Sequence, residues 1–294
     1  MAVIGHWIGA FPLSYLVPHA SVTLLCKMAM LSDMIAGLLV LLKIEFATTF
    51  PWYLSTPPPA TKQLLSDWKS KGQWLPKVDE SAAQGFKGFP GLFPFYLDIT
   101  YSHSVEGMAI ASILVVFFMR LRYRISLGYA TAIFVAAISH PVLDMFFHDA
   151  YLLAGNRAVT RISFNFWQIA YIGPISFLLE CGLAYAGYRI WWSTRVPISD
   201  DPDVVSKISK YTKMFWSLAL SHNMTSFYVA SPLLIWAMYR FAPSVEFGTP
   251  ACYWAWILFA LTMWSWAFAL YPLHKLEGLT RFKGAVADEY HKIP

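Results

Sequence analysis

The segment Ser139-His140-Pro141-Val142-Leu143-Asp144-Met145-Phe146-Phe147-His148-Asp149 closes an apolar run that begins near Leu127. On a helix, residues spaced four apart lie on one face, so His140, Asp144 and His148 would point the same way. Ionisable side chains at membrane depth usually face the interior of a helix bundle and mark a site. This face therefore predicts half of a metal site. The alternative is two hydrogen-bonded histidines at a helix end, with Asp144 pairing one of them.

The composition is that of a membrane protein. Of the 294 residues, 57% are hydrophobic and 13% are charged, whereas soluble proteins average roughly 45–50% apolar and about 25% charged residues. The net charge is +5, but the Lys and Arg residues lie mostly between apolar runs, which indicates orientation signals and no nucleic-acid surface. The cysteines, Cys26, Cys181 and Cys252, lie in different apolar runs without paired spacing, so we expect no disulfide.

Two apolar runs open the chain. Residues 3–17 are too few for a comfortable crossing of about 20 residues, and Pro18 ends the run. The second run, 20–44, is long enough to cross and carries Asp33. If the two runs form a hairpin about Pro18, His6 and Asp33 lie roughly 18 and 22 Å from the turn, at about 1.5 Å per residue. We therefore expect these two side chains to reach a similar depth.

The predicted fold is all-α: a polytopic membrane helix bundle of about six spans plus a short N-terminal apolar helix. Residues 1–193 would form the core, including 45–98 as a Pro-, Gly- and Trp-containing interfacial cap loop over the site. Residues 194–213 would be a cytosolic linker, and 214–294 two additional spans with a charged tail. The spans are predicted at 20–44, 103–119, 127–147, 165–192, 214–239 and 251–271.

Basic residues give these spans a direction. They follow the second, fourth and sixth spans, and the cluster Arg120-Leu121-Arg122-Tyr123-Arg124 is the densest of them. The positive-inside rule makes these ends cytosolic. The histidines then lie near the opposite surface, on the exoplasmic, lumenal or periplasmic side.

Separate segments thus supply candidate metal ligands at comparable depth. Imidazole and carboxylate groups together suit zinc or another first-row divalent ion, and such an ion favours hydrolysis as the reaction class. Six candidates exceed the three protein ligands of one catalytic zinc, so one ion with additional outer partners and two ions both remain open. The candidates are His6, Asp33, His103, His140, Asp144 and His148.

The order of these motifs resembles that of a known family. Bacterial membrane-bound metal-dependent hydrolases, the YdjM-like, LexA-binding inner-membrane group and its short relatives, carry an early Gly-His, a Leu-Asp, a Tyr-Thr-His-Ser turn and a Ser-His-(three residues)-Asp helix in this order. The similarity covers roughly residues 5–192 and includes Ile44-Glu45 and Leu179-Glu180. The matching segments here are Gly5-His6, Leu31-Ser32-Asp33, Tyr101-Ser102-His103-Ser104 and Ser139-His140 with Asp144 and His148.

The resemblance implies a metal-dependent hydrolase, with departures. Ser102 replaces the usual threonine, Glu106 stands where the relatives tend to be apolar, and the last two spans have no counterpart. More remotely, the ligand order is similar to that of zinc-dependent phospholipase C and related nucleases, which hints at phosphodiester chemistry.

Three further acids are candidate catalytic residues. Asp98 could orient the His103 imidazole or cap a span. Glu106, one turn beyond His103, could be a general base or a hydrogen-bonded buried acid. Glu180 is isolated in an apolar span, where a carboxylate needs a partner, so it could be a ligand or a proton relay.

Three functions fit these residues. The first is a hydrolase whose partners are membrane lipid and a small amphiphilic ester or phosphoester, because a site at bilayer depth is reached most easily from the membrane. The second is a transporter or permease that uses the same His/Asp/Glu cluster to bind protons or a cation. The third is a structural subunit of a membrane complex. The oligomeric state is left open.

Overall fold

The computed structural model describes residues 3–42, 44–49, 95–98, 101–147, 150–153, 161–162, 173–223 and 266–283. These residues are mostly helical, as predicted, and their strands form only two-stranded antiparallel sheets. The helices are α1 (Val3–His6), η1 (Trp7–Gly9), α2 (Phe11–Leu16), α3 (Val22–Ala29), α4 (Leu31–Leu41), α7 (Val105–Tyr123), α8 (Leu127–Phe147), α9 (Gly173–Ser193), α10 (Pro202–Asn223) and α13 (Ala267–Leu279). The strand pairs are β1 (Phe46–Thr49) with β2 (Phe95–Asp98), β3 (Ala150–Tyr151) with β4 (Arg161–Ile162), and β5 (Arg195–Pro197) with β6 (Thr280–Phe282).

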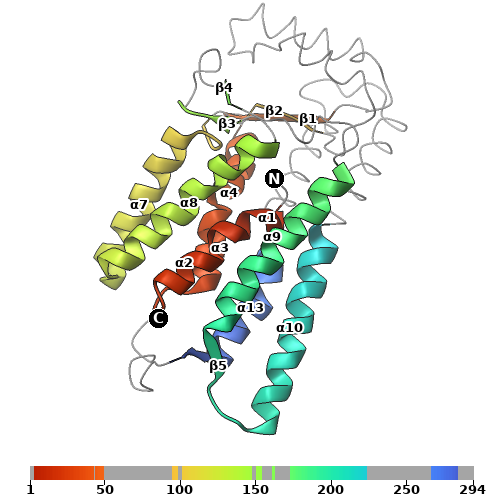
Figure 1. Cartoon of the computed structure of the whole chain (residues 1–294). Coiled ribbons are helices and arrows are strands. Elements are labelled where there is room, and N and C mark those ends of the chain that lie inside the picture. Colours follow the sequence, from red (N-terminus) through yellow and green to blue (C-terminus); the bar gives the residue numbers. More distant parts are fainter. Residues whose placement is uncertain are drawn as a thin grey trace, which may run out of the picture.

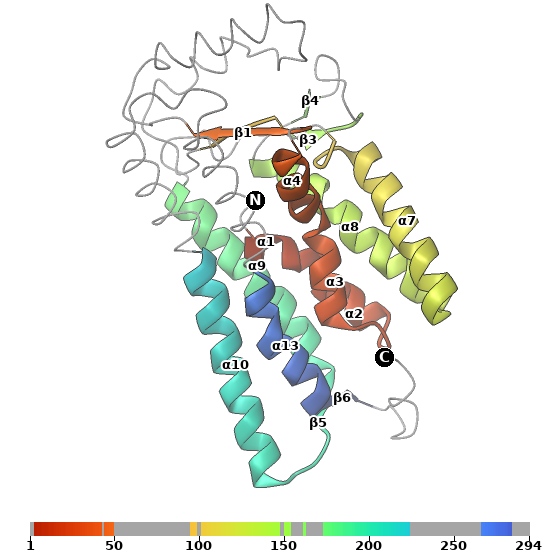
Figure 2. The same cartoon turned by 180° about the vertical axis from the view of Figure 1, so that it is seen from behind.

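The helices form two groups around the N-terminal elements. α7 and α8 pack together along one side, and α9, α10 and α13 lie along the other (Figures 1 and 2). α3 packs on α8, whereas α1, η1 and α2 pack on α9. The N-terminal segment therefore joins the two helix groups, and residues from distant parts of the sequence meet around it.

The second apolar run is interrupted within the structure. α3 ends at Ala29 and α4 starts at Leu31, and the two axes are bent by 45°. Neither proline nor glycine stands at the break, and the Met30 N–H donates to the Lys27 carbonyl at 3.1 Å, which tightens the last turn of α3. The break leaves the Ala29 carbonyl available to a side chain.

The start of α3 is bound by α13. The Ser21 hydroxyl accepts the Leu24 N–H at 3.2 Å and donates to Glu277 of α13 at 3.0 Å. The Glu277 carboxylate also accepts the N–H groups of Val22 and Thr23. A carboxylate is favourable at a helix N-terminus, so this contact ties α13 to the core.

α7 and α8 form a hairpin with a polar reversal. Ser104 caps α7 by accepting the Gly107 N–H at 2.9 Å, and Arg124 ends the helix in the left-handed conformation with φ 51°. The three arginines 120, 122 and 124 are exposed there, at the end opposite His103. The predicted basic turn is therefore present.

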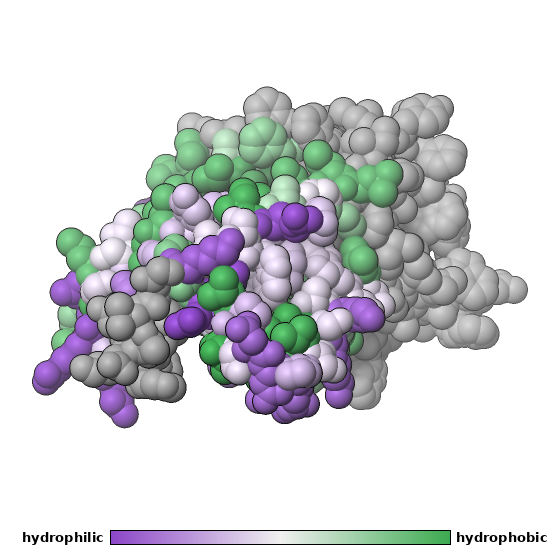
Figure 3. Space-filling model, turned by 60° about the horizontal axis from the view of Figure 1, so that its bottom comes forward, coloured by the Kyte–Doolittle hydropathy of each residue, from purple (hydrophilic) through white to green (hydrophobic). Residues whose placement is uncertain are grey.

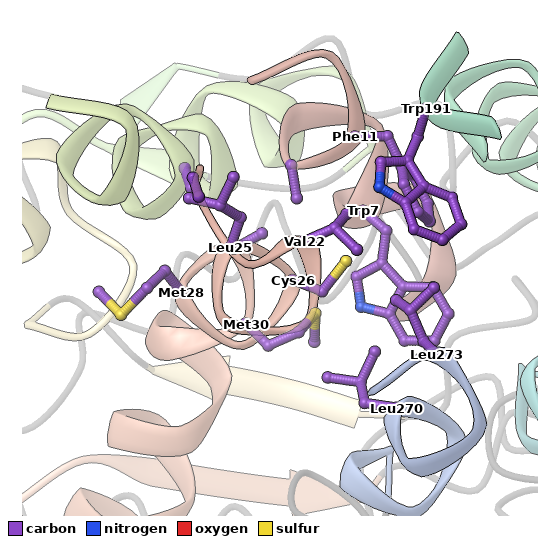
Figure 4. Packing of buried hydrophobic residues seen from close by; sticks show 14 of the residues in the cluster. Trp7, Phe11, Val22, Leu25, Cys26, Met28, Met30, Trp191, Leu270 and Leu273 are labelled. Carbon is purple, nitrogen blue, oxygen red and sulfur yellow. The ribbon is translucent and has the colours of Figure 1, made fainter. Parts of the chain in front are cut away.

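The hydrophobic core fills the space between the two helix groups. Large side chains from η1, α2, α3, α9 and α13 interdigitate there (Figure 4). α8, which packs on α3, contributes Tyr129, Ile133 and several small buried residues, among them Ala132, Ala136 and Ala137. Small side chains permit close helix contact, which brings polar groups on the two helices within reach of each other.

The six-span prediction is not supported by the described helices. By length and composition, one of them could cross a membrane, Leu127–Phe146, or two if the bent pair Val22–Ala29 and Leu31–Leu39 counts as a broken span. The segment 194–213, predicted as a cytosolic linker, contains β5 and the first half of α10. α10 begins with charged residues, such as the exposed Asp203–Lys207 ion pair, which gave the segment its linker-like composition. Most of the predicted cap and of the last two spans lies outside the described residues.

Candidate metal centre

Five of the six predicted ligands converge in one buried cluster. His6 ends α1, Asp33 lies in the first turn of α4, His103 precedes α7, and His140 and Asp144 lie one turn apart on α8. Four of the side chains are at most 3% exposed, and that of Asp33 is 13% exposed. His148, the sixth predicted ligand, lies outside the described residues.

The donor atoms are spaced as they would be around a cation. Nε2 of His103 lies 3.3 Å from Asp33 Oδ1 and 3.7 Å from Asp144 Oδ2. Nε2 of His140 lies 3.6 and 3.1 Å from the same two oxygens. Nε2 of His6 lies 3.3 Å from Asp144 Oδ1. Two atoms that share an ion at about 2.0–2.1 Å lie roughly 3.0–3.4 Å apart, so most of these separations fit common ligands.

The break between α3 and α4 orients His140. Its Nδ1 lies 2.6 Å from the Ala29 carbonyl, and because a carbonyl only accepts, Nδ1–H is the donor. In the neutral imidazole this leaves the lone pair on Nε2, which faces Asp33 and Asp144. A lone pair directed at two carboxylates is unfavourable unless a cation lies between them. If His140 were doubly protonated, its Nε2–H would instead donate to Asp144. Measurement of bound metal distinguishes this ion pair from a metal-bound His140.

His103 is held in the same tautomer by a side chain. The Ser102 hydroxyl donates to Glu45 Oε2 at 2.6 Å, so its oxygen accepts from His103 Nδ1–H at 2.9 Å. Nε2 of His103 is therefore also directed at the cluster. A neutral imidazole is the form that binds a metal.

His6 completes the cluster from a different part of the fold. Its ring stacks on that of His140, with centroids 3.7 Å apart and planes 8° apart. η1 follows directly, and a Cβ atom at Gly9 would overlap the side chain of Ser139, so only glycine permits this approach to α8. The close packing of η1 on α8 thus sets the position of His6.

The charges of the cluster match one divalent ion. Two overlapping ligand groups can be drawn, His6–Asp33–His140 and His103–His140–Asp144, with donor atoms within 4.8 Å of one another in each. Both groups use His140. With neutral imidazoles the cluster would carry a charge of −2 from its two carboxylates, which a single divalent cation would neutralise.

The predicted catalytic acids lie in three different settings. Glu106 is exposed in the first turn of α7, unlike the buried ligands. Glu180 is fully buried in α9, which packs on α1. Asp98 ends β2 opposite Phe46 of β1. Their roles as general base, proton relay and orienting acid remain predictions.

Sequence reasoning missed two groups that support the ligands. Glu45 was noted only as part of the family resemblance, and nothing in the pattern signalled that the Ala29 carbonyl is available. Ser32 adds a third support, because its hydroxyl donates to the Ser102 carbonyl and ties α4 to the turn that carries His103. No family model, curated protein or solved structure matches this chain.

Proposed function

We propose that this chain is a membrane-bound hydrolase that uses one divalent metal ion, zinc by preference, to cleave an amphiphilic ester or phosphoester. The observation that carries the proposal is the convergence of three imidazole Nε2 atoms and two carboxylates at ligand spacing. His6, Asp33, His103, His140 and Asp144 would hold the ion. When bound, such an ion lowers the pKa of a water ligand and polarises a carbonyl or phosphoryl oxygen.

The outer surface of α7 supports a location in the membrane. This face carries large exposed apolar side chains along the helix and ends in exposed arginines, as expected for a lipid-facing helix with its end at the headgroups. Figure 3 shows hydrophilic residues gathered at this end of the molecule, with hydrophobic residues above them in that view. The exposed apolar residues of α7 are Ile110, Ile113, Leu114, Phe117, Phe118 and Leu121.

The depth of the site favours an amphiphilic substrate. α8 carries His140 and Asp144 and is also the helix that meets the length and composition of a membrane span. A substrate that partitions into lipid reaches such a site more easily than one confined to water. The ester or phosphoester bond would lie near a headgroup, on the exoplasmic, lumenal or periplasmic side if the arginines face the cytosol.

One observation favours a second candidate, a cation-coupled transporter. Transporters often bind ions where a membrane helix is broken, and the break between α3 and α4 contacts the ligand His140. Cation flux into proteoliposomes without hydrolysis would support this function. Hydrolysis without flux would exclude it as the principal activity.

The test begins with the purified full-length protein in detergent. We expect about one zinc ion per chain, measured by elemental mass spectrometry, and metal-dependent cleavage of one or more compounds in a panel of ester and phosphoester lipids. His140→Ala should remove both the metal and the cleavage, because both ligand groups contain this residue. His19→Ala is the matched control, because His19 is exposed at the turn before α3. Wild-type protein without metal at neutral pH would refute the proposal.

A further inference from the structure

We infer that Glu45 is a positioning residue for the metal centre, acting on the ligand His103 through the hydroxyl of Ser102. The inference rests on the proposed function, because it gives Glu45 its role only if the cluster binds a metal. Glu45 follows α4 and directly precedes β1, at 5% exposure. It lies far from His103 in sequence, and its contacts with the turn at 101–102 bring it next to this ligand.

The carboxylate of Glu45 is fixed in place by three donors. Oε1 accepts the N–H groups of Tyr101 and Ser102, both at 2.7 Å, and Oε2 accepts the Ser102 hydroxyl at 2.6 Å. Backbone N–H groups can only donate, so they favour the ionised carboxylate. An ionised Glu45 accepts the single proton of Ser102. The Ser102 oxygen can then only accept from His103 Nδ1–H.

Hydrogen bonds thus run from His103 Nδ1–H through the Ser102 hydroxyl to Glu45, and this path, the Glu45 relay, sets which nitrogen of His103 can bind a metal. A ligating histidine usually donates its other ring N–H to an acceptor, which fixes the tautomer and ring plane and makes the ligand nitrogen more basic. His140 has a backbone carbonyl for this purpose, whereas His103 has a hydroxyl polarised by a buried negative charge. Without Glu45, the Ser102 hydroxyl could rotate and donate to Nδ1. That would move the imidazole proton to Nε2, the atom that faces Asp33 and Asp144.

The Glu45 relay also joins the metal centre to the two-stranded sheet of β1 and β2. Glu45 is adjacent to Phe46, which pairs with Asp98 in that sheet. Its contacts with Tyr101 and Ser102 therefore link the start of β1 to the turn that carries His103. The role of Asp98 as a partner of His103 stays a prediction, and the connection from Glu45 to His103 runs through Ser102.

The experiment measures metal binding rather than turnover. Zinc affinity is determined by chelator competition on full-length protein in detergent, and Co²⁺ d–d absorption reports the ligand set. We expect Glu45→Gln and Ser102→Ala to weaken zinc binding by about 10- to 100-fold and to change the cobalt spectrum. Ser102→Thr keeps the hydroxyl and should stay within about threefold of wild type. The double variant should be no weaker than the worse single variant, because both changes cut one path.

Two variants control for general damage. Glu277→Gln alters a carboxylate that also accepts backbone N–H groups, but at the start of α3. Ser112→Ala removes a buried hydroxyl that donates within α7 to the carbonyl groups of Met108 and Ala109. Neither should change zinc affinity or the cobalt spectrum, whatever their effect on thermal stability.

The outcomes separate this inference from the proposed function. If wild-type protein binds zinc, His140→Ala does not, and Glu45→Gln and Ser102→Ala bind like wild type, the positioning role is refuted and the metal centre stands. If wild type and His140→Ala both fail to bind zinc, both proposals fall. Equal losses in Glu45→Gln and Glu277→Gln would reduce Glu45 to a structural role. Should Glu45→Gln not fold, the Ser102 variants decide the matter.

Discussion

Gly107→Ala is expected to damage the metal centre through backbone packing alone. Gly107 lies in the first turn of α7, where its N–H is capped by Ser104. A Cβ atom there would overlap the Tyr101 carbonyl oxygen and lie 2.7 Å from Ser104 Oγ. Because a carbonyl cannot rotate away as a flexible side chain can, the turn from Tyr101 to Ser104 would have to shift. His103 lies within that turn.

The size of the effect follows from three contributions. Overpacking costs about 1–3 kcal/mol, weakening the Ser104 cap costs about 1 kcal/mol, and the better helix propensity of alanine returns about 1 kcal/mol. The net loss is about 2 kcal/mol, which corresponds to a fall in apparent Tm of about 4–8 °C for a chain of this size. Zinc affinity should fall at least about tenfold, as the shift moves a ligand.

The assay compares Gly107→Ala with Gly182→Ala by thermal unfolding and chelator competition. A Cβ atom at Gly182 of α9 would meet no heavy atom within 4 Å, so that variant should be as stable as wild type or slightly more stable, with unchanged zinc affinity. If both variants behave alike in both measurements, the reasoning about the turn is wrong.

The remaining predictions concern the ion and two contacts. Chelation of zinc should lower the apparent Tm by about 5–10 °C relative to protein in free zinc at 100 times the Kd, since bound metal then contributes about 2.7 kcal/mol to stability. Identical melting curves with and without chelator would contradict the metal centre. Gly9→Ala should separate η1 from Ser139 and weaken zinc binding about tenfold in chelator competition, whereas Gly128→Ala, which meets nothing within 4 Å, should not. Glu277→Gln should destabilise the protein by about 1–2 kcal/mol in thermal unfolding without altering zinc affinity, because it weakens charge-assisted bonds at the start of α3.

Local spacing was sufficient to predict much of the candidate site. His140 and Asp144 share a helix face because of their four-residue separation, and the hairpin argument about Pro18 anticipated that His6 and Asp33 reach a common depth. The structure brings both pairs together with His103. These predictions depend on periodicity and chain length, which a sequence displays directly.

Other features depended on contacts that no pattern displays. The interruption at Met30 lacks proline and glycine, so the run looked like one continuous span. The Glu45 relay joins residues far apart in sequence, and its geometry depends on the path of the chain around the turn at 101–104. The polar composition of 194–213 suggested a linker, although an exposed amphipathic helix such as α10 has the same composition.

Because the helix is interrupted at Met30, two hydrogen-bond donors can compete for the Ala29 carbonyl oxygen. In an unbroken helix it would receive the Asp33 N–H, whereas here it receives the imidazole of His140. Withdrawing the ring frees that oxygen, so straightening of the α3–α4 segment competes with assembly of the site. By reciprocity, whatever holds His140 in place also holds the segment bent. We expect amide exchange at Asp33 to slow in His140→Ala, and faster or unchanged exchange would show that the bend is fixed by packing alone.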